Sequence, residues 1–118
     1  MTTKDYDFTI PQGSTYHLIA EWKTPEEVPI STVGYKARLQ IRRRKDSPGT
    51  LLSLTSDGGD IVLGGANGRV TATITSATAA LLKFKTAKYD LELYNTDSPP
   101  YVKRLLQGTV TLDWEVTR

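Results

Sequence analysis

Alternation of apolar and polar residues runs along most of this chain, and it constrains the fold more than any other feature. Between residues 35 and 42 every second side chain is apolar, and the side chains between them are basic or amide. A period of two places one set of side chains on one face of a β-strand and the other set on the opposite face. The pattern therefore predicts a β-rich protein whose strands each have one buried face.

The same alternation predicts further strands along the chain, at 6–10, 16–22, 52–54, 61–63, 69–75, 89–93 and 102–116. Residues rich in Gly, Pro, Asn and Asp lie between the strands and favour tight turns. The turn at 11–13 predicts a hairpin of the first two strands, and the turns at 45–49 and 64–68 predict a meander. Residues 23–34 contain two prolines and predict a surface loop.

Two segments depart from the alternation. Residues 76–83 read SATAALLK, in which Ala and Leu favour helix and Ser76 could cap it. We expect one or two helical turns there, bridging two sheets. In the long last strand, Gly108 leaves one face without a side chain, which predicts a bend or bulge at that residue.

Length and composition favour a single all-β domain over residues 1–118. The chain has 118 residues, 38% of them hydrophobic and 24% charged, with 17 threonines. Two separate cores would each be too small for stability, and threonine is a strand former. We therefore predict one all-β domain, a sandwich or a barrel, with one short helical segment near 76–83. Its core is expected to contain Phe8, Ile10, Leu18, Trp22, Leu39, Ile41, Val70, Ile74, Leu91, Leu93, Leu112 and Trp114.

The absence of cysteine excludes disulfides, thiolate catalysis and cysteine-ligated zinc or iron–sulfur centres. No apolar run approaches the roughly 20 residues that span a bilayer. The first ten residues lack the basic and apolar regions of a signal peptide. These observations predict a soluble protein that is made in the cytoplasm and has no membrane partner.

Motifs for metal or phosphate binding are incomplete. His17 is the single histidine and falls on the polar face of its strand. Asp57 and Asp60 lack the ladder of oxygen ligands of a calcium loop. The glycine-rich segment 64–68 lacks the Lys-Ser/Thr of a phosphate loop and precedes a strand. No cofactor and no metal are expected.

Pairs of carboxylates for acid–base chemistry are equally weak. Glu26 and Glu27 are adjacent in a loop, and Asp113 and Glu115 lie on the outward face of a strand. A catalytic pair has to meet at a substrate, and solvated carboxylates on a strand do not. We therefore expect a protein that is not an enzyme and has no small-molecule substrate.

The residues Arg42, Arg43, Arg44 and Lys45 form the main cluster of charge. The net charge of +2 and the lack of aromatic residues among them argue against nucleic acid as the partner. Arginine is enriched in protein interfaces and matches carboxylates, so an acidic protein partner is expected. The candidate interface residues are Arg42, Arg43, Arg44, Tyr94 and Tyr101, the two tyrosines flanking a Pro-Pro turn.

The order of several short motifs is similar to that of a family of small tailed-bacteriophage virion proteins. The family also includes N-terminal domains that join fibres or receptor-binding proteins to the tail. The motifs are IPQGSTY at 10–16, YKARLQIR at 35–42, GRVTATIT at 68–75, YDLEL at 89–93 and LQGTV at 106–110.

The resemblance implies an immunoglobulin-like or related antiparallel β-sandwich that serves as a structural component of the virion, in the tail, baseplate or fibre attachment. It would act by protein–protein assembly, without catalytic residues or cofactors. The implied partners are other virion proteins and copies of the chain itself in a symmetric assembly. The chain stops at Arg118 without a receptor-binding part, which implies a stand-alone component located in the virion and made in the host cytoplasm.

Two alternatives remain open at this point. One is an accessory protein of the capsid or head–tail junction. The other is a carbohydrate-binding β-sandwich in which Trp22, Trp114 and Tyr101 stack on sugar rings. By alternation both tryptophans share a face with Leu and Val, which favours the core for each of them.

Overall fold

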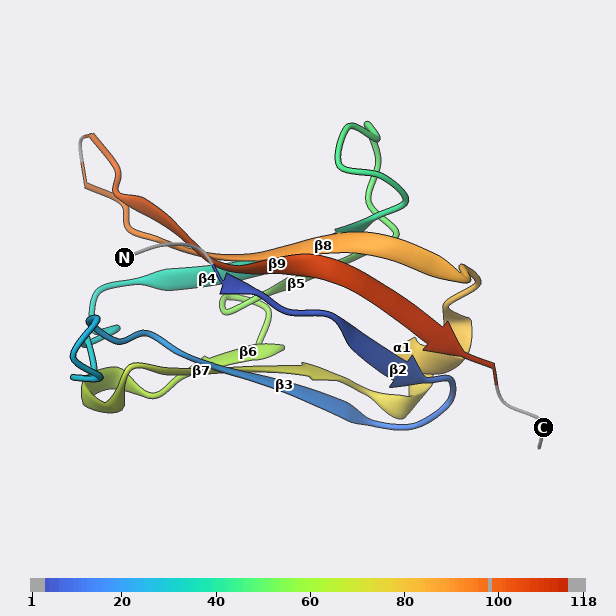
Figure 1. Ribbon diagram of the computed structural model, residues 1–118, viewed down its shortest axis with the longest axis horizontal. Helices are drawn as coiled ribbons and strands as arrows, with labels where there is room; N and C mark the ends of the chain where they lie inside the picture. Colours follow the sequence, from blue (N-terminus) through green and yellow to red (C-terminus); the bar gives the residue numbers. More distant parts are fainter. Residues whose placement is uncertain (1–3, 98, 115–118) are drawn as a thin grey trace.

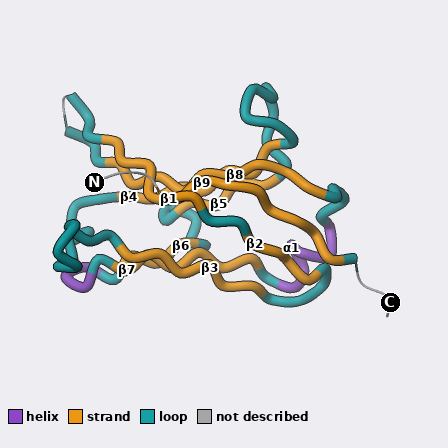
Figure 2. The backbone as a smooth tube through the Cα atoms, in the orientation of Figure 1, coloured by secondary structure: helices purple, strands orange, loops and turns teal. Residues whose placement is uncertain are grey.

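Two β-sheets packed face to face make up the computed structural model, which describes residues 4–97 and 99–114 (Figure 1). Figure 2 shows the strands as two layers, with the loops gathered mainly at the ends. The strands are β1 Lys4–Asp5, β2 Phe8–Pro11, β3 Tyr16–Glu21, β4 Lys36–Arg42, β5 Leu52–Thr55, β6 Ile61–Leu63, β7 Arg69–Ile74, β8 Thr86–Tyr94 and β9 Val102–Asp113. A 3-10 turn at Gly65–Asn67 and the helix α1 at Ser76–Leu81 complete the elements. The prediction of a mostly β sandwich with one short helix is thus confirmed.

The larger sheet has the order β1-β9-β8-β4-β5, and β2 also pairs with β9. Pairs β4–β5, β4–β8 and β8–β9 are antiparallel, but β1 and β2 both run parallel to β9. The expectation of a wholly antiparallel sandwich is therefore wrong for this sheet. The alternation of a strand shows which face is buried, but it carries no information about the direction of the neighbouring strand.

The smaller sheet is antiparallel, with the order β3-β7-β6. The predicted hairpin of the first two strands is wrong, because β2 lies in the larger sheet and β3 in the smaller. The backbone N–H of Gln12 donates to the carbonyl of Asp113, and its side-chain amide donates to the carbonyl of Leu82. These bonds hold the turn as it crosses between the layers.

The expected meander is confirmed at its turns 45–49 and 64–68, which join the antiparallel pairs β4–β5 and β6–β7, but it is wrong between β5 and β6. The strand β5 pairs with β4 in the larger sheet, and β6 pairs with β7 in the smaller one. Residues 56–60 therefore cross between the sheets. Residues 56–60 contain Gly58 and Gly59. Glycine favours a turn, but it does not determine whether the next strand stays in the same sheet or passes to the other one.

The core lies between the sheets, and every predicted core residue except Trp114 is buried. Trp114 is 47% exposed, so its assignment to the core is wrong. The ladder between β2 and β9 ends at the pair Pro11–Asp113, one residue earlier. Trp114 lies beyond that last pair, so the alternation does not determine where its side chain points.

The helix α1 forms within the predicted segment, but its cap is Thr75 and not Ser76. The hydroxyl of Thr75 accepts a hydrogen bond from the backbone N–H of Thr78, at 3.3 Å. Ala79 is the buried residue of the helix, and Leu82, just after the helix, is also buried in the core. The helix thereby closes one end of the sandwich (Figure 1).

The irregularity in β9 falls at Leu105 and not at Gly108. Leu91 pairs with Leu106 while Glu92 pairs with Arg104, so Leu105 is the extra residue. Both Leu105 and Leu106 are buried as a result. A β-bulge of this kind redirects side chains locally.

Burial of Tyr89 leads to a prediction about alkaline pH. Its hydroxyl donates to the carbonyl of Tyr6, and its ring lies edge-on to Phe8. Burial raises the pKa of the Tyr89 phenol above its usual value near 10. Above about pH 10 the unfolded chain releases a proton that the folded chain keeps, so stability falls as pH rises.

We expect Tyr89→Phe to make the loss of stability above about pH 10 shallower, because the substitution removes this titration. The measurement is urea unfolding at a series of pH values from neutral to alkaline. A Tyr89→Phe chain that loses stability as steeply as the parent would contradict the assignment.

Candidate interaction site

The basic turn, Arg42 to Lys45, begins at the last residue of β4. The side chain of Arg42 stabilises this turn. Its guanidinium donates to the carbonyl of Ser47 at 2.8 Å and to the side-chain oxygen of Gln40 at 3.1 Å. Arg42 thus ties residue 47 back to the strand and is half-buried. It holds the turn in place and is less available to a partner than the sequence suggested.

Arg43 and Arg44 follow Arg42 and are exposed. The backbone N–H of Arg44 donates to the hydroxyl of Ser47 at 3.0 Å, which fixes the backbone of the turn. The guanidinium of Arg44 lies 3.7 Å from the carboxylate of Asp46, and both side chains are solvated. The turn therefore presents two arginines from a braced backbone.

The two predicted tyrosines lie in the long β8–β9 hairpin. The guanidinium of Arg38 lies 4.7 Å from the ring centroid of Tyr94, a cation–π geometry. Tyr101 is half exposed and packs edge-on against Tyr35, which packs edge-on against the buried Trp22. A continuous row of rings thus joins the core to the loop of the hairpin.

The structure does not bring the predicted arginines and tyrosines into one patch. They lie near opposite ends of β4, because Lys36 pairs with Tyr94 while Arg42 pairs with Lys88. Six residues of strand separate the two ends, which amounts to about 20 Å. The sequence prediction therefore names two separate surfaces.

A polar depression lies on the outer face of the larger sheet beside Arg42. The carboxylate of Asp90 lies 3.6 Å from the guanidinium of Arg104 within it. Burial raises the pKa of Asp90, as does Glu92, against the opposing effect of nearby arginines. The residues that line the depression are Gln40, Arg42, Lys45, Lys88, Tyr89, Asp90, Arg104 and Gln107.

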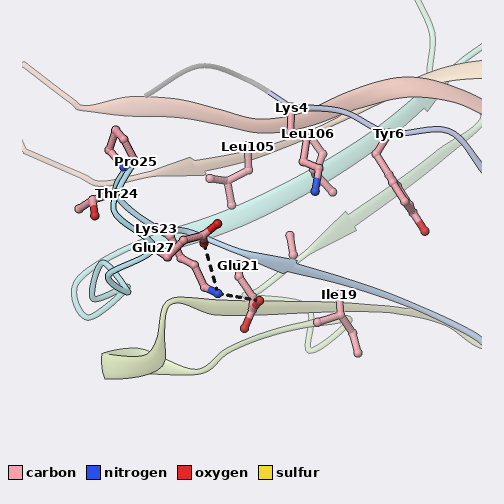
Figure 3. Close-up of a pocket in the computed structure, with 11 residues that line it drawn as sticks. Lys4, Tyr6, Ile19, Glu21, Lys23, Thr24, Pro25, Glu27, Leu105 and Leu106 are labelled. Atoms are coloured by element: carbon pink, nitrogen blue, oxygen red, sulfur yellow. Dashed lines mark ion pairs between the residues drawn. The ribbon is translucent and has the colours of Figure 1, made fainter.

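A larger hollow of about 920 Å³, here called the edge groove, lies where the borders of the two sheets diverge. One wall comes from the larger sheet and the other from β3 and the loop after it (Figure 3). Along the wall formed by β3 and its loop, Lys23 lies 3.3 Å from Glu21 and 3.7 Å from Glu27. Its lining residues are Lys4, Tyr6, Ile19, Ala20, Glu21, Lys23, Thr24, Pro25, Glu27, Leu105 and Leu106.

Sequence reasoning missed both hollows. The edge groove exists because β1 and β3 are border strands of different sheets, and strand order cannot be read from alternation. Outward-facing Lys88 and Arg104 are visible in the pattern of β8 and β9. Only the register shows that Lys88 lies opposite Arg42 and that Arg104 lies opposite Glu92.

The residues considered for metal binding are used in other ways. Asp57 accepts from the amine of Lys36 at 3.2 Å, and the ring of His17 lies 2.9 Å from the hydroxyl of Thr73. Within 4–97 and 99–114, no group of three or more His, Cys, Asp or Glu could hold an ion. The same ranges contain no helix with the length and hydropathy needed to cross a bilayer.

The two sequence comparisons found no match, whereas the comparison with solved structures did. No protein family matches the sequence, and no curated protein matches it either. Among solved structures, the crystal structure of sialyltransferase from Photobacterium damsela aligns with a TM-score of 0.40 and 11% identity. The alignment covers 96% of this chain and 18% of the sialyltransferase chain.

Proposed function

We propose that this chain is a structural component of a tailed-bacteriophage virion, in the tail, baseplate or fibre attachment, and that it acts by protein–protein assembly. The order of its sequence motifs supports the virion, and the braced turn that carries Arg43 and Arg44 supports the protein contact. A capsid or head–tail position is the alternative within the same class. Mass spectrometry of purified virions tests the proposal directly, and absence of the chain from them would refute it.

The braced turn carries the proposal for the kind of contact. Arg42 and Ser47 hold its backbone before any partner arrives. A surface that is already ordered loses less conformational entropy on binding. The guanidinium fork of arginine binds a carboxylate through two hydrogen bonds. The turn therefore docks on an acidic patch of a neighbouring virion protein.

We expect the double substitution Arg43→Glu and Arg44→Glu to leave the fold intact and to lower incorporation into particles. Both side chains are solvated in the free chain, so their reversal costs little stability. The loss should steepen as ionic strength rises, because salt screens the contact that remains. The measurement is the amount of chain in purified particles at several salt concentrations.

The matched control is Lys83→Glu with Lys85→Glu, which changes the net charge equally at two exposed residues before β8. Normal incorporation of this control separates the turn from a general effect of charge. If the arginine variant is folded and incorporated normally, the turn is not the docking surface. Arg42 is left intact in this test because it braces the turn.

The carbohydrate-binding alternative retains two exposed aromatic residues, Trp114 and Tyr101, whereas Trp22 is 5% exposed. Tyr101 precedes β9 and Trp114 follows it. A strand of that length separates them by about 40 Å, too far for one short glycan to stack on both. The geometry of the described residues thus favours assembly over sugar binding.

A further inference from the structure

Among the described residues, β3 is the longest border strand without a protecting feature. It has six residues and pairs along all of them with β7, without a bulge. The other border strands are shorter, with two residues in β1, three in β6 and four in β5 and β2, and β2 also contains Pro11. Proteins usually blunt an exposed edge with lysine, proline, a bulge or a short strand, and β3 has none of these within its bounds.

Backbone geometry shows which residues of β3 face the open side. The N–H of Trp22 donates to the carbonyl of Gly68, so the ladder with β7 uses Trp22 and every second residue before it. In an antiparallel ladder the intervening residues direct their N–H and C=O away from that neighbour. His17, Ile19 and Glu21 therefore present their backbone groups along the free edge, which borders the edge groove.

The side chains of these three residues form a pattern that complements itself. All three lie on the outer face of the smaller sheet, and Ile19 is 58% exposed. When a second β3 runs antiparallel with Ile19 opposite Ile19, each Glu21 lies opposite the His17 of the other copy. Apolar then meets apolar and acid meets imidazole, which is the favourable arrangement for cross-strand pairs.

We propose that two copies of this chain pair through their β3 edges, antiparallel and with Ile19 on the two-fold axis. The pair forms one continuous sheet with three strands from each copy. This inference rests on the proposed function, because it identifies the surface by which copies of the chain contact one another in the assembly.

The alternative registers are less favourable. Centring the axis on Glu21 places two carboxylates opposite each other, and centring it on His17 places Ile19 opposite Thr15. Like charges directly across a ladder are destabilising. The selected register is therefore favoured by charge and by apolar contact together.

The pairing also gives the edge groove an occupant. The β3 strand of the second copy occupies the space between β3 and the residues Tyr6, Leu105 and Leu106. An isologous contact of this kind closes after two copies and does not grow into a fibre. Because it is a small interface, the pair is weak in free solution and forms firmly where neighbouring proteins hold the copies together.

Cysteine cross-linking tests the pairing, because the chain has no cysteine of its own. Residues opposite each other in a hydrogen-bonded antiparallel pair have Cα atoms about 5.5 Å apart, within the range that a disulfide spans. We expect Ile19→Cys to give a disulfide-linked dimer under mild oxidation at high protein concentration. The matched control is Val62→Cys, 63% exposed on the same face but across β7 from Ile19. This control should remain largely monomeric.

A second measurement tests the pairing if the cysteine variants fail to fold or aggregate. Ile19→Lys places two like charges on the axis and should raise the dimer dissociation constant at least about tenfold, while Val62→Lys should leave it unchanged. Sedimentation over a wide concentration range measures both.

Equal cross-linking of the two cysteine variants, or a dimer that survives Ile19→Lys, would overturn the proposal. So would protection of Ile19 in particles by an extended segment of a different protein. Presence of the chain in virions without the cross-linked dimer would overturn this inference and leave the proposed function standing.

Discussion

Replacing Trp22 with alanine is expected to lower the free energy of unfolding by about 3–5 kcal/mol, whereas Trp114→Ala changes it by no more than about 0.5 kcal/mol. Trp22 is 5% exposed and packs edge-on against Tyr35, with ring centroids 5.2 Å apart. Trp114 is 47% exposed and follows the last pair of β9. Urea unfolding of the two variants beside the parent measures the difference.

The Trp22 effect is large relative to the total stability of a typical domain, about 5–15 kcal/mol. Both substitutions replace tryptophan with alanine. The difference between their free energies of unfolding therefore measures the effect of burial alone. Equal losses for both variants would show that Trp114 packs into the core, and that β9 keeps its alternation beyond Asp113.

Replacing Gly108 with alanine is expected to cost about 1–3 kcal/mol, because the position is already filled. A Cβ atom there would lie 2.4 Å from the carbonyl oxygen of Tyr6 and 2.7 Å from the carboxylate of Asp7. That carboxylate also accepts a hydrogen bond from the N–H of Thr109, at 2.8 Å. The N-terminal segment must therefore move away from β9 to admit one methyl group.

Urea unfolding gives the cost, and hydrogen exchange locates the movement. The N–H of Tyr6 donates to the carbonyl of Gln107, and its exchange should quicken in the Gly108→Ala chain. The control is Gly49→Ala, because a Cβ atom at Gly49 meets nothing within 4 Å. A Gly108→Ala chain as stable as this control would show that residues 6–7 do not lie against Gly108.

The buried faces of the strands could be predicted from the sequence because alternation is a local property. In β4 and β8 the inward residues follow the predicted pattern, with Ala37, Leu39 and Ile41 facing the core. The pairing of strands could not be predicted in the same way. The turn after Pro11 has hairpin chemistry but carries the chain to the other sheet, because Gln12 bonds to Leu82 and Asp113.

The candidate interaction residues show the same contrast between local features, which the sequence predicts, and contacts between distant residues, which it does not. The exposure of Arg43 and Arg44 follows from a run of charge at the end of a strand. The bracing of the turn by Arg42 depends on the position of Ser47, five residues on, which alternation does not describe. The edge groove could not be predicted from the sequence. Its walls come from β1 and β9 in one sheet and β3 in the other, and the alternation does not show which strands are neighbours.

The parallel pairing of β1 and β2 with β9 has a consequence for the order of folding. Asp7 and Thr109 are hydrogen-bonded partners 102 residues apart. Until β9 has left the ribosome, β1 and β2 have no strand to pair with in the larger sheet. Closing so long a loop slows folding toward the millisecond-to-second range of all-β domains. The wall of the edge groove that carries Tyr6 and Leu106 therefore forms late in folding.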